Sequence, residues 1–344
     1  MPLIVLPTDT LDPFLQKIQK LFTAGYGLPE PVKYTKITDG LINQTYSIDD
    51  CWILQHVHSI FGPQVNEDIA ALSAILQGRG VPVPLMCRSG EGTYYVLGEH
   101  YGLTEGPWRI MTKLEGTTHH FVQNIEQIRA LTRMISAFHR ALDGCRYEFN
   151  HTRPGVHDFE RHYKALERAV DEHKDHRLYT QVRDLFEKIQ HLSKDIQYNN
   201  VMLCTDLRII HGDPKISNFL FEDDRITGVV DLDTMARSRA AFEVGDAIRS
   251  WCNPCKEDVE PAYNREYARE VMGLYLEETK CLSRAERASL MHAAPFITLE
   301  LSMRFAKDAL CEDYFGFNPD IGHGEHSLMR AGAMYQLCTQ MLME

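Results

Sequence analysis

The sequence predicts an α+β fold, with a small antiparallel β-rich N-terminal part and a larger, mainly helical C-terminal part. Short apolar segments separated by turn residues occupy most of the first 113 residues. Long segments with helical periodicity begin at Glu126 and continue to the C-terminus. Because the strands come first and the helices follow, the two kinds of element are expected to segregate. The predicted domains are residues 1–113 and residues 114–344.

The N-terminal part is expected to open with a helix and to continue as an antiparallel meander. Apolar residues at positions 11, 14, 15, 18, 21 and 22 have helical periodicity and predict a helix over residues 11–22. Turn-forming residues at Asp39-Gly40 and Asp49-Asp50 separate the first strands. The expected strands are 34–37, 45–48, 51–57, 94–97 and 108–113, with one further helix at 65–76.

The C-terminal part is predicted to consist of amphipathic helices. Apolar residues recur there at intervals of three and four, which is the pattern of a helix that buries one face. No internal repeat and no low-complexity tract is found. The expected helices span 126–142, 158–171, 177–194, 263–278, 284–310 and 326–342.

Composition and charge exclude several classes of protein. Of the 344 residues, 44% are hydrophobic and 24% are charged, which is typical of a globular chain. The net charge of -12 and the pI of about 5.7 argue against a nucleic-acid partner. No apolar run approaches the roughly 18 residues of a membrane span, so no membrane partner is expected. The first residues do not form a signal peptide, and a cytoplasmic location is therefore predicted.

The cysteines predict neither a disulfide framework nor a zinc site. Their number, nine, is odd, and their spacing is irregular. Cys252 and Cys255 form a lone CxxC, whereas a structural zinc site normally needs a second pair of ligands. Free thiols are the expected state.

The segment with the clearest chemical meaning runs from Ile209 to Asp233. It contains His211-Gly212-Asp213, with Asn218 five residues after the aspartate, and then Asp231 at the end of a Val-Val strand. Aspartate, asparagine and glycine also form ordinary turns, so any single match carries little weight. The joint pattern is that of phosphoryl transfer, which needs a carboxylate to accept a proton and oxygen ligands to hold magnesium.

This pattern resembles the catalytic loop and metal-binding strand shared by protein kinases and the aminoglycoside phosphotransferase/choline kinase superfamily. The resemblance implies a two-lobed protein-kinase-like fold that uses ATP and Mg²⁺. It implies Asp213 as the base and Lys215 as a charge beside the transferred phosphate. Asn218 and Asp231 are implied as magnesium ligands, and Asp233 as a second ligand or a bracing carboxylate.

The N-terminal part resembles the nucleotide-binding lobe of such kinases. Gly40, Asn43 and Thr45 lie where a strand-turn-strand covers the phosphates, and Gly40 permits close approach of the backbone. Met111 and Lys113 end the strand that leads to the hinge, where adenine is bound mainly by backbone groups. These residues are the expected contacts to the cofactor.

One position departs from the general kinase pattern. Gln55 stands on the third strand, where a phosphate-pairing lysine is expected, and glutamine carries no charge. Either Lys33 or Lys36 reaches in from a neighbouring strand, or the phosphates depend more on magnesium and Lys215. Gln55 itself is also a candidate contact to the nucleotide.

Over most of its length the chain is similar to the N-acetylhexosamine 1-kinase branch of the superfamily, in which Gln55 is a shared feature. The resemblance implies an enzyme that phosphorylates the anomeric hydroxyl of an N-acetylhexosamine (GlcNAc or GalNAc) to the sugar 1-phosphate. The motifs that carry it are Gly40-Leu41-Ile42-Asn43, Ile53-Leu54-Gln55, Trp108-Arg109, Asp231-Leu232-Asp233-Thr234, Gly245-Asp246-Ala247-Ile248-Arg249, Glu300 to Phe305, Asp313-Tyr314-Phe315 and His326 to Arg330.

The acceptor is expected to contact Arg304, Asp313 and Tyr314. A guanidinium donates hydrogen bonds to sugar oxygens but repels cationic acceptors. The alternative for Arg304 is an ion pair with Glu300, one helical turn earlier.

Two other functions are also compatible with the sequence. One is a kinase of another alcohol, of the aminoglycoside, choline or homoserine type. The other is a nucleotide-binding pseudokinase. The partner is expected to be a small molecule, and the sequence does not define the oligomeric state.

Overall fold

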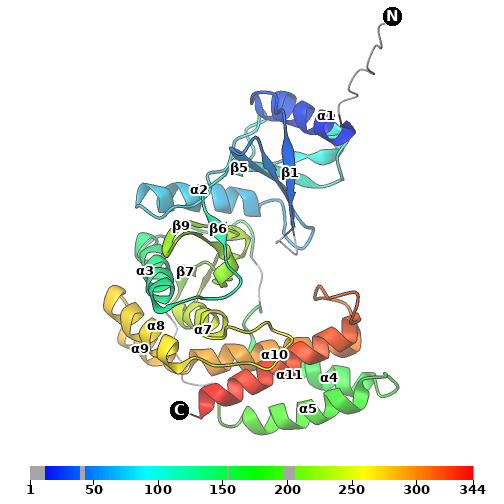
Figure 1. Cartoon of the computed structure of the whole chain (residues 1–344), viewed down its shortest axis with the longest axis vertical. Helices are drawn as coiled ribbons and strands as arrows, with labels where there is room; N and C mark the ends of the chain where they lie inside the picture. The colour runs from blue at the N-terminus through cyan, green and yellow to red at the C-terminus, as the bar shows by residue number, and fades with distance from the viewer. Residues whose placement is uncertain (1–11, 39–42, 153–154, 197–205, 344) are drawn as a thin grey trace, which may run out of the picture. The chain divides into compact units, whose positions relative to one another are not determined.

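The computed structural model describes residues 12–38, 43–152, 155–196 and 206–343 (Figure 1). The chain divides into two compact units. The first consists of Met1–Ala74 and Val83–Leu114, and the second of Ile75–Pro82 and Glu115–Glu344.

The first unit is built on a five-stranded antiparallel sheet with the order β1-β2-β3-β5-β4. Helix α1 (Pro13–Lys20) precedes the sheet, is capped by the Asp12 side chain, and continues as a π-helical turn over Leu21–Gly25. The strands are β1 (Tyr34–Ile37), β2 (Gln44–Ile48), β3 (Trp52–His56), β4 (Val96–Leu97) and β5 (Pro107–Thr112), and helix α2 spans Val65–Gly78.

The two faces of this sheet have different roles because side chains alternate along each strand. One face packs against α1, where Leu54 and Trp108 join the apolar core with Ile18. Gln55 and Arg109, the next residues along β3 and β5, therefore lie on the opposite face.

The second unit is mainly helical and contains two small antiparallel sheets. One sheet has the order β6-β8-β9, and the other pairs β7 with β10. The strands are β6 (Thr117–Thr118), β7 (Arg208–Ile210), β8 (Phe219–Glu222), β9 (Arg225–Val229) and β10 (Ala236–Ser238). The helices are α3 (Ile125–Ala141), α4 (Phe159–Glu172), α5 (Tyr179–Leu192), α7 (Ala240–Trp251), α8 (Arg265–Glu278), α9 (Arg284–Leu290), α10 (Ala293–Cys311) and α11 (His323–Leu342).

Most predicted helices and strands are present, with ends displaced by up to three residues. The single helix predicted over 284–310 is wrong. The chain forms α9 and α10 there, with Met291 as the C-cap of the first and His292 as the N-cap of the second. Pro295 is the third residue of α10, a position in the first turn where its missing N–H breaks no helical hydrogen bond. Helix α10 then packs along α11 in the second unit (Figure 1).

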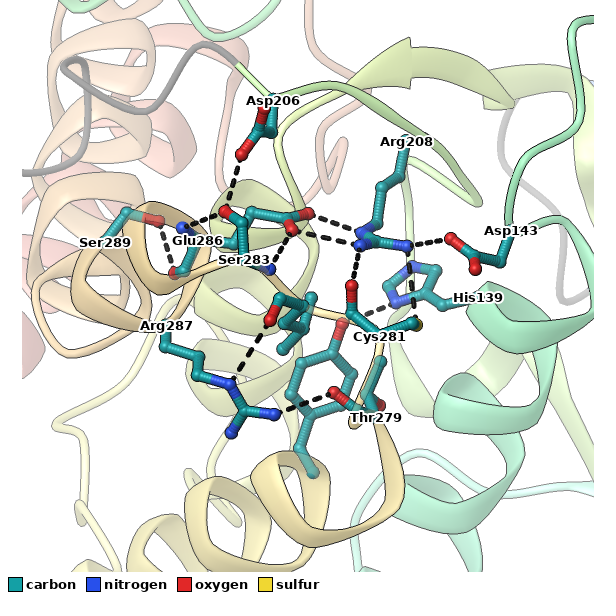
Figure 2. Close-up of polar contacts among 12 residues, drawn as sticks. His139, Asp143, Asp206, Arg208, Thr279, Cys281, Ser283, Glu286, Arg287 and Ser289 are labelled. Atoms are coloured by element: carbon teal, nitrogen blue, oxygen red, sulfur yellow. Dashed lines mark hydrogen bonds and ion pairs between the residues drawn. The ribbon is translucent and has the colours of Figure 1, made fainter.

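Arg208, the first residue of β7, ties this strand to the start of α9 (Figure 2). Its guanidinium is paired with both carboxylate oxygens of Glu286, which is almost fully buried. It also donates to Asp143 Oδ1 at 2.5 Å and to the carbonyl oxygen of Cys281 at 2.8 Å. Glu286 completes a capping box by accepting from the backbone N–H of Ser283 at 2.7 Å.

In the part of the chain that the structure describes, no helix has the length and apolar character needed to span a bilayer. The eight cysteines described are all free.

We predict that Glu286→Ala lowers the free energy of unfolding by about 3 kcal/mol, because it leaves the Arg208 guanidinium, whose side chain is only 12% exposed, without its main counter-charge. Urea unfolding followed by circular dichroism measures the change. Glu222→Ala, which removes the partner of Arg225 in an exposed pair, should have little effect. Equal effects of the two substitutions would contradict the importance of the buried pair.

Candidate active site

The site is built around a short loop, His211 to Lys215, that follows β7. Gly212 has a φ of +83°, in the left-handed region that favours glycine. A Cβ atom at this position would lie 2.3 Å from the carbonyl oxygen of Thr234. The loop can therefore approach the Asp231–Thr234 segment closely only because residue 212 has no side chain.

His211 holds the loop through hydrogen bonds. Its ring is buried, its Nδ1 accepts from the backbone N–H of Asp213 at 3.3 Å, and its Nε2 lies 2.9 Å from the carbonyl oxygen of Val230. Since Nδ1 accepts, Nε2 carries the proton and donates to Val230. Burial lowers the pKa of His211, which keeps the ring neutral in this arrangement.

The structure brings Asp213, Lys215 and Asn218 together. Lys215 Nζ donates to Asp213 Oδ2 at 2.6 Å, and Asn218 Nδ2 donates to the same oxygen at 3.1 Å and to the Asp213 carbonyl oxygen at 2.7 Å. Burial by itself raises the pKa of Asp213, but the adjacent Lys215 ammonium reverses the shift, so the pKa lies below its usual value. Asp213 is thus an oriented carboxylate that is ionised at neutral pH.

Asp231 and Asp233 differ in exposure. The Asp231 side chain is 39% exposed, and its Oδ2 lies 3.9 Å from Lys215 Nζ. Its backbone has a φ of +63°, which turns the chain sharply at the end of β9. Asp233 is buried, with 2% of the residue exposed. The burial of Asp233 favours the bracing alternative over a second metal ligand.

The donor atoms present suit magnesium. The Asn218 amide nitrogen is used in hydrogen bonds, which leaves its amide oxygen as the atom that could bind a cation. Together with the accessible carboxylate of Asp231, this makes a set of hard oxygen donors, as Mg²⁺ requires. Among the described residues, no group of three or more His, Cys, Asp and Glu side chains could hold a metal ion. A magnesium ion here would take further ligands from phosphate and water.

Helix α7 lies beneath the loop and holds it at three points. Glu243 accepts the backbone N–H groups of His211 and Gly212, each at 2.9 Å. Trp251 Nε1 donates to the carbonyl oxygen of Pro214 at 2.7 Å, and Ser250 Oγ accepts from Ile216 N at 3.4 Å.

The Gly245-Asp246 pair of the same helix does not provide this brace. Asp246 instead pairs with Arg249, its Oδ1 lying 2.7 Å from Arg249 Nε. Glu243 was missed, although an acidic residue inside the apolar run of α7 could have indicated it.

Glu243 shares its buried environment with His139 and Tyr275. Tyr275 Oη lies 2.6 Å from His139 Nδ1, and His139 Nε2 faces Glu243 Oε1 at 3.8 Å (Figure 2 shows the His139 side of this group). Burial lowers the pKa of His139 to about 3, so at neutral pH this contact is not an ion pair. Burial also raises the pKa of Glu243 to about 8, against the opposing effect of the two N–H donors.

The predicted cofactor contacts lie in the first unit, except that Gly40 falls outside the described residues. Asn43 Oδ1 accepts from the His58 backbone N–H at 2.9 Å. Thr45 Oγ1 accepts from Gln55 Nε2 at 3.0 Å. Met111 is buried and pairs in register with Ile53 on β3.

The lysines that could replace the charge missing at position 55 do not lie beside Gln55. Lys33 and Lys113 both contact Asp50, at 2.5 and 3.3 Å. Lys36 is opposite Tyr46 in the β1–β2 register, so it lies on the face of the sheet that packs against α1. Gln55 instead accepts from Arg109 on β5, through Nε at 2.9 Å and Nη2 at 2.6 Å.

The predicted acceptor residues lie in the C-terminal half of α10 and in the loop after it. The Arg304 guanidinium lies 5.9 Å from the Tyr314 ring and 5.5 Å from the Phe315 ring. It does not pair with Glu300, whose Oε1 lies 3.2 Å from His157 Nδ1.

The loop after α10 is shaped by Asp308, a fully buried carboxylate. Its Oδ1 accepts from Tyr314 N at 2.8 Å, and its Oδ2 contacts His323 Nε2 at 2.9 Å and Ser327 Oγ at 2.7 Å. Asp313 does not join Arg304; its carboxylate binds Lys307 Nζ at 2.7 Å.

We predict that Glu243 makes stability depend on pH in a defined direction. Its folded pKa of about 8 lies above the ordinary 4.5, so the folded state holds a proton that the unfolded state releases. The stability of the wild type relative to Glu243→Gln should be greatest below pH 4.5 and should decline as the pH rises to about 8. Urea unfolding at several pH values measures this difference.

Glu187→Gln, at an exposed position on α5, is the matched control and should show no such trend. A stability difference between wild type and Glu243→Gln that stays constant over this pH range would contradict the prediction.

Comparison with known proteins assigns the chain to a family. A model described as the phosphotransferase enzyme family matches residues 33–277. Among curated proteins, the homoserine kinase of Zymomonas mobilis is 23% identical over 261 residues, covering 74% of each protein. The homoserine kinase of Nitrobacter winogradskyi is 31% identical over 97 residues, so the match spans only 28% of this chain and 27% of that protein.

Solved structures show the same fold at low identity. An ADP-bound aminoglycoside phosphotransferase aligns with a TM-score of 0.57 and 14% identity, covering 95% of this chain and 99% of that chain. An amicoumacin kinase in complex with AMP-PNP and Ca²⁺ gives 0.60 and 15%, covering 94% and 93%. A choline kinase from Cryptosporidium parvum gives 0.55 and 12%, covering 90% and 88%. The fold is thus the two-lobed α+β fold of kinase-like proteins, and the chain belongs to the phosphotransferase enzyme family.

Proposed function

We propose that this protein is an ATP-dependent kinase of a small molecule, which transfers the terminal phosphoryl group to an alcohol with Asp213 as the base. The observation that carries the proposal is the cluster of Asp213, Lys215 and Asn218 in one loop, held from below by Glu243. The intact cluster also argues against a pseudokinase. The eight free cysteines support a reducing compartment such as the cytoplasm.

Each residue has a distinct role in this proposal. Asp213 accepts the proton of the acceptor hydroxyl, and the hydrogen bond from Asn218 fixes the direction of its carboxylate. Lys215 stabilises negative charge that develops during transfer. Asn218 and Asp231 would hold Mg²⁺, which supplies charge neutralisation for the phosphates of bound ATP. Lys215 must then leave Asp213 for the phosphate, an exchange that its 41% exposed side chain permits.

For the acceptor we propose an N-acetylhexosamine, phosphorylated at the anomeric hydroxyl. Arg304 supports this choice because its half-buried guanidinium has no carboxylate within ion-pair distance in the described part of the chain, and it lies over two aromatic rings. Such a group favours acceptors rich in oxygen and disfavours cations such as choline or an aminoglycoside. Tyr314, which is half exposed, offers a ring on which a sugar could stack.

Homoserine is the second candidate acceptor. The Zymomonas mobilis relative carries that activity in its name and aligns with 74% of this chain. The same unpaired Arg304 could bind the α-carboxylate of an amino acid in a two-pronged hydrogen bond. The two acceptors therefore share one recognition group and have to be separated by experiment.

We predict that Asp213→Asn folds normally and lowers kcat by at least about 100-fold, since asparagine cannot take the proton from the acceptor. Coupled measurement of ADP release gives kcat, and thermal unfolding checks the fold. Asp171→Asn, at an exposed position on α4, serves as the control and should keep wild-type turnover. Undiminished turnover of Asp213→Asn would refute the base assignment.

We expect an acceptor panel to identify the substrate. GlcNAc, GalNAc, homoserine, choline and kanamycin are each incubated with magnesium ATP, and phosphorus NMR locates the new phosphate. Arg304→Met should raise KM for the true acceptor about 10- to 100-fold, the effect of losing one or two charge-assisted hydrogen bonds, while KM for ATP stays unchanged. Arg183→Met, on the exposed side of α5, is the control.

Preference for choline or kanamycin over the neutral and zwitterionic acceptors would rule out the proposed acceptor class. An unchanged acceptor KM in Arg304→Met would remove Arg304 from the acceptor site.

A further inference from the structure

We propose that Arg109 binds the phosphates of the nucleotide and so replaces the lysine that is missing from the third strand. This inference rests on the proposed use of ATP. It concerns the first unit alone, where Gln55 occupies the expected lysine position and none of Lys33, Lys36 and Lys113 is placed to replace it.

The register of the sheet puts Arg109 beside the lysine position. Gln55 on β3 and Arg109 on β5 are direct partners across the two antiparallel strands. Partners of this kind project from the same face, with their Cβ atoms about 5 Å apart. The Arg109 guanidinium binds Gln55 Oε1 at 2.6 and 2.9 Å and Asn66 Oδ1 of α2 at 3.3 Å. A cation is thus held where a lysine at position 55 would present one.

Thr45 extends this group into a continuous polar row. Its hydroxyl accepts from Gln55 Nε2 at 3.0 Å, so Thr45, Gln55 and Arg109 link β2, β3 and β5 through hydrogen bonds. The row carries one full positive charge and several N–H and O–H groups. Phosphate oxygens are the ligands that such a row suits, because a guanidinium pairs with them in two-pronged geometry.

The neighbouring row on the same face has a different character. This second row consists of Ser47, Ile53 and Met111, which are partners across β2, β3 and β5. Each lies two residues along its strand from a member of the polar row, a distance of about 7 Å. Ile53 and Met111 are apolar, while the buried Ser47 hydroxyl has no hydrogen-bond partner among the described residues. A flat base against this row and phosphates against the polar row would match the two parts of a nucleotide.

Arg109 is only 2% exposed, so binding a phosphate requires an exchange of hydrogen bonds. Gln55 and Asn66 accept from it through neutral amide oxygens. The guanidinium is already an ionised donor in these bonds, but a phosphate oxygen adds the attraction between two opposite charges, which a neutral amide oxygen lacks. Phosphate oxygens can therefore displace amide oxygens from the guanidinium, and the released Gln55 amide can itself donate to a phosphate.

The test compares nucleotides that differ only in their phosphates. Calorimetry of the full chain with Mg²⁺ measures the affinities for adenosine, ADP and ATP. Arg109→Met should weaken ATP binding roughly 10- to 100-fold, the loss expected for one or two charge-assisted hydrogen bonds, and should leave adenosine binding unchanged. Arg109→Lys should keep most of the ATP affinity. Lys36→Met, on the other face of the sheet, is the control and should bind both like the wild type.

A double variant, Arg109→Met with Gln55→Lys, returns the cation to the third strand and should recover most of the ATP affinity. If Arg109→Met does not fold, Arg109→Gln, which keeps a polar but uncharged side chain at this position, takes its place in the comparison and should show the same selective loss of ATP affinity. Unchanged ATP affinity in Arg109→Met, equal losses of ATP and adenosine affinity, or no recovery in the double variant would overturn the inference. If the wild type itself binds no ATP, the proposed kinase function fails instead.

Discussion

The loop from His211 to Lys215 depends on one carboxyl group that lies underneath it, that of Glu243. The loop between β7 and β8 forms no ladder of its own at His211 and Gly212, so their N–H groups need a partner from another element. Glu243 accepts both, one on each oxygen of its carboxyl group. An unpaired buried N–H group costs about 1–3 kcal/mol, so this single side chain decides whether the loop can keep its shape. The position of Asp213 follows from it.

This arrangement is a compromise between stability and geometry. Burying Glu243 among α3, α7 and α8 makes its charged form unfavourable, and its neighbours His139 and Tyr275 are themselves buried polar groups. His139 Nε2 has no hydrogen-bond partner in the described ranges of the chain. Apolar residues at these positions would pack at lower energetic cost, but they could not accept two backbone N–H groups. The loop therefore keeps its geometry, while the core beneath it contains polar groups that are less favourable to bury than apolar ones.

The loop after α10, which carries two of the proposed acceptor contacts, is held in the same way. Asp308 is a buried carboxylate on α10 that accepts backbone N–H groups from the loop containing Asp313 and Tyr314. In both places a rigid helix supplies the acceptor and a loop supplies the donors. The side chains to which we assign roles are thereby presented from loops that have little freedom to move. Members of one fold family differ in substrate because the side chains on such loops differ, which is why the fold by itself does not name the acceptor.

The sequence alone determined those features that depend on neighbours along the chain. Periodicity predicted most helices and strands, and the spacing of Asp213, Lys215 and Asn218 predicted a cluster, because residues of one short loop cannot lie far apart. The break between α9 and α10 was missed, since the apolar pattern continues across Met291 and His292.

Tertiary structure decided the partners that are distant in the sequence. Glu243, rather than Asp246, holds the loop because the register of α7 beneath β7 places that turn of the helix under the N–H groups. Arg304 is left without Glu300 because His157, from a segment more than a hundred residues earlier, takes that carboxylate. Arg109 meets Gln55 through strand pairing alone. Local sequence patterns indicate which residues are buried and which form turns. The choice among several possible charged partners depends on distances that exist only after the chain has packed.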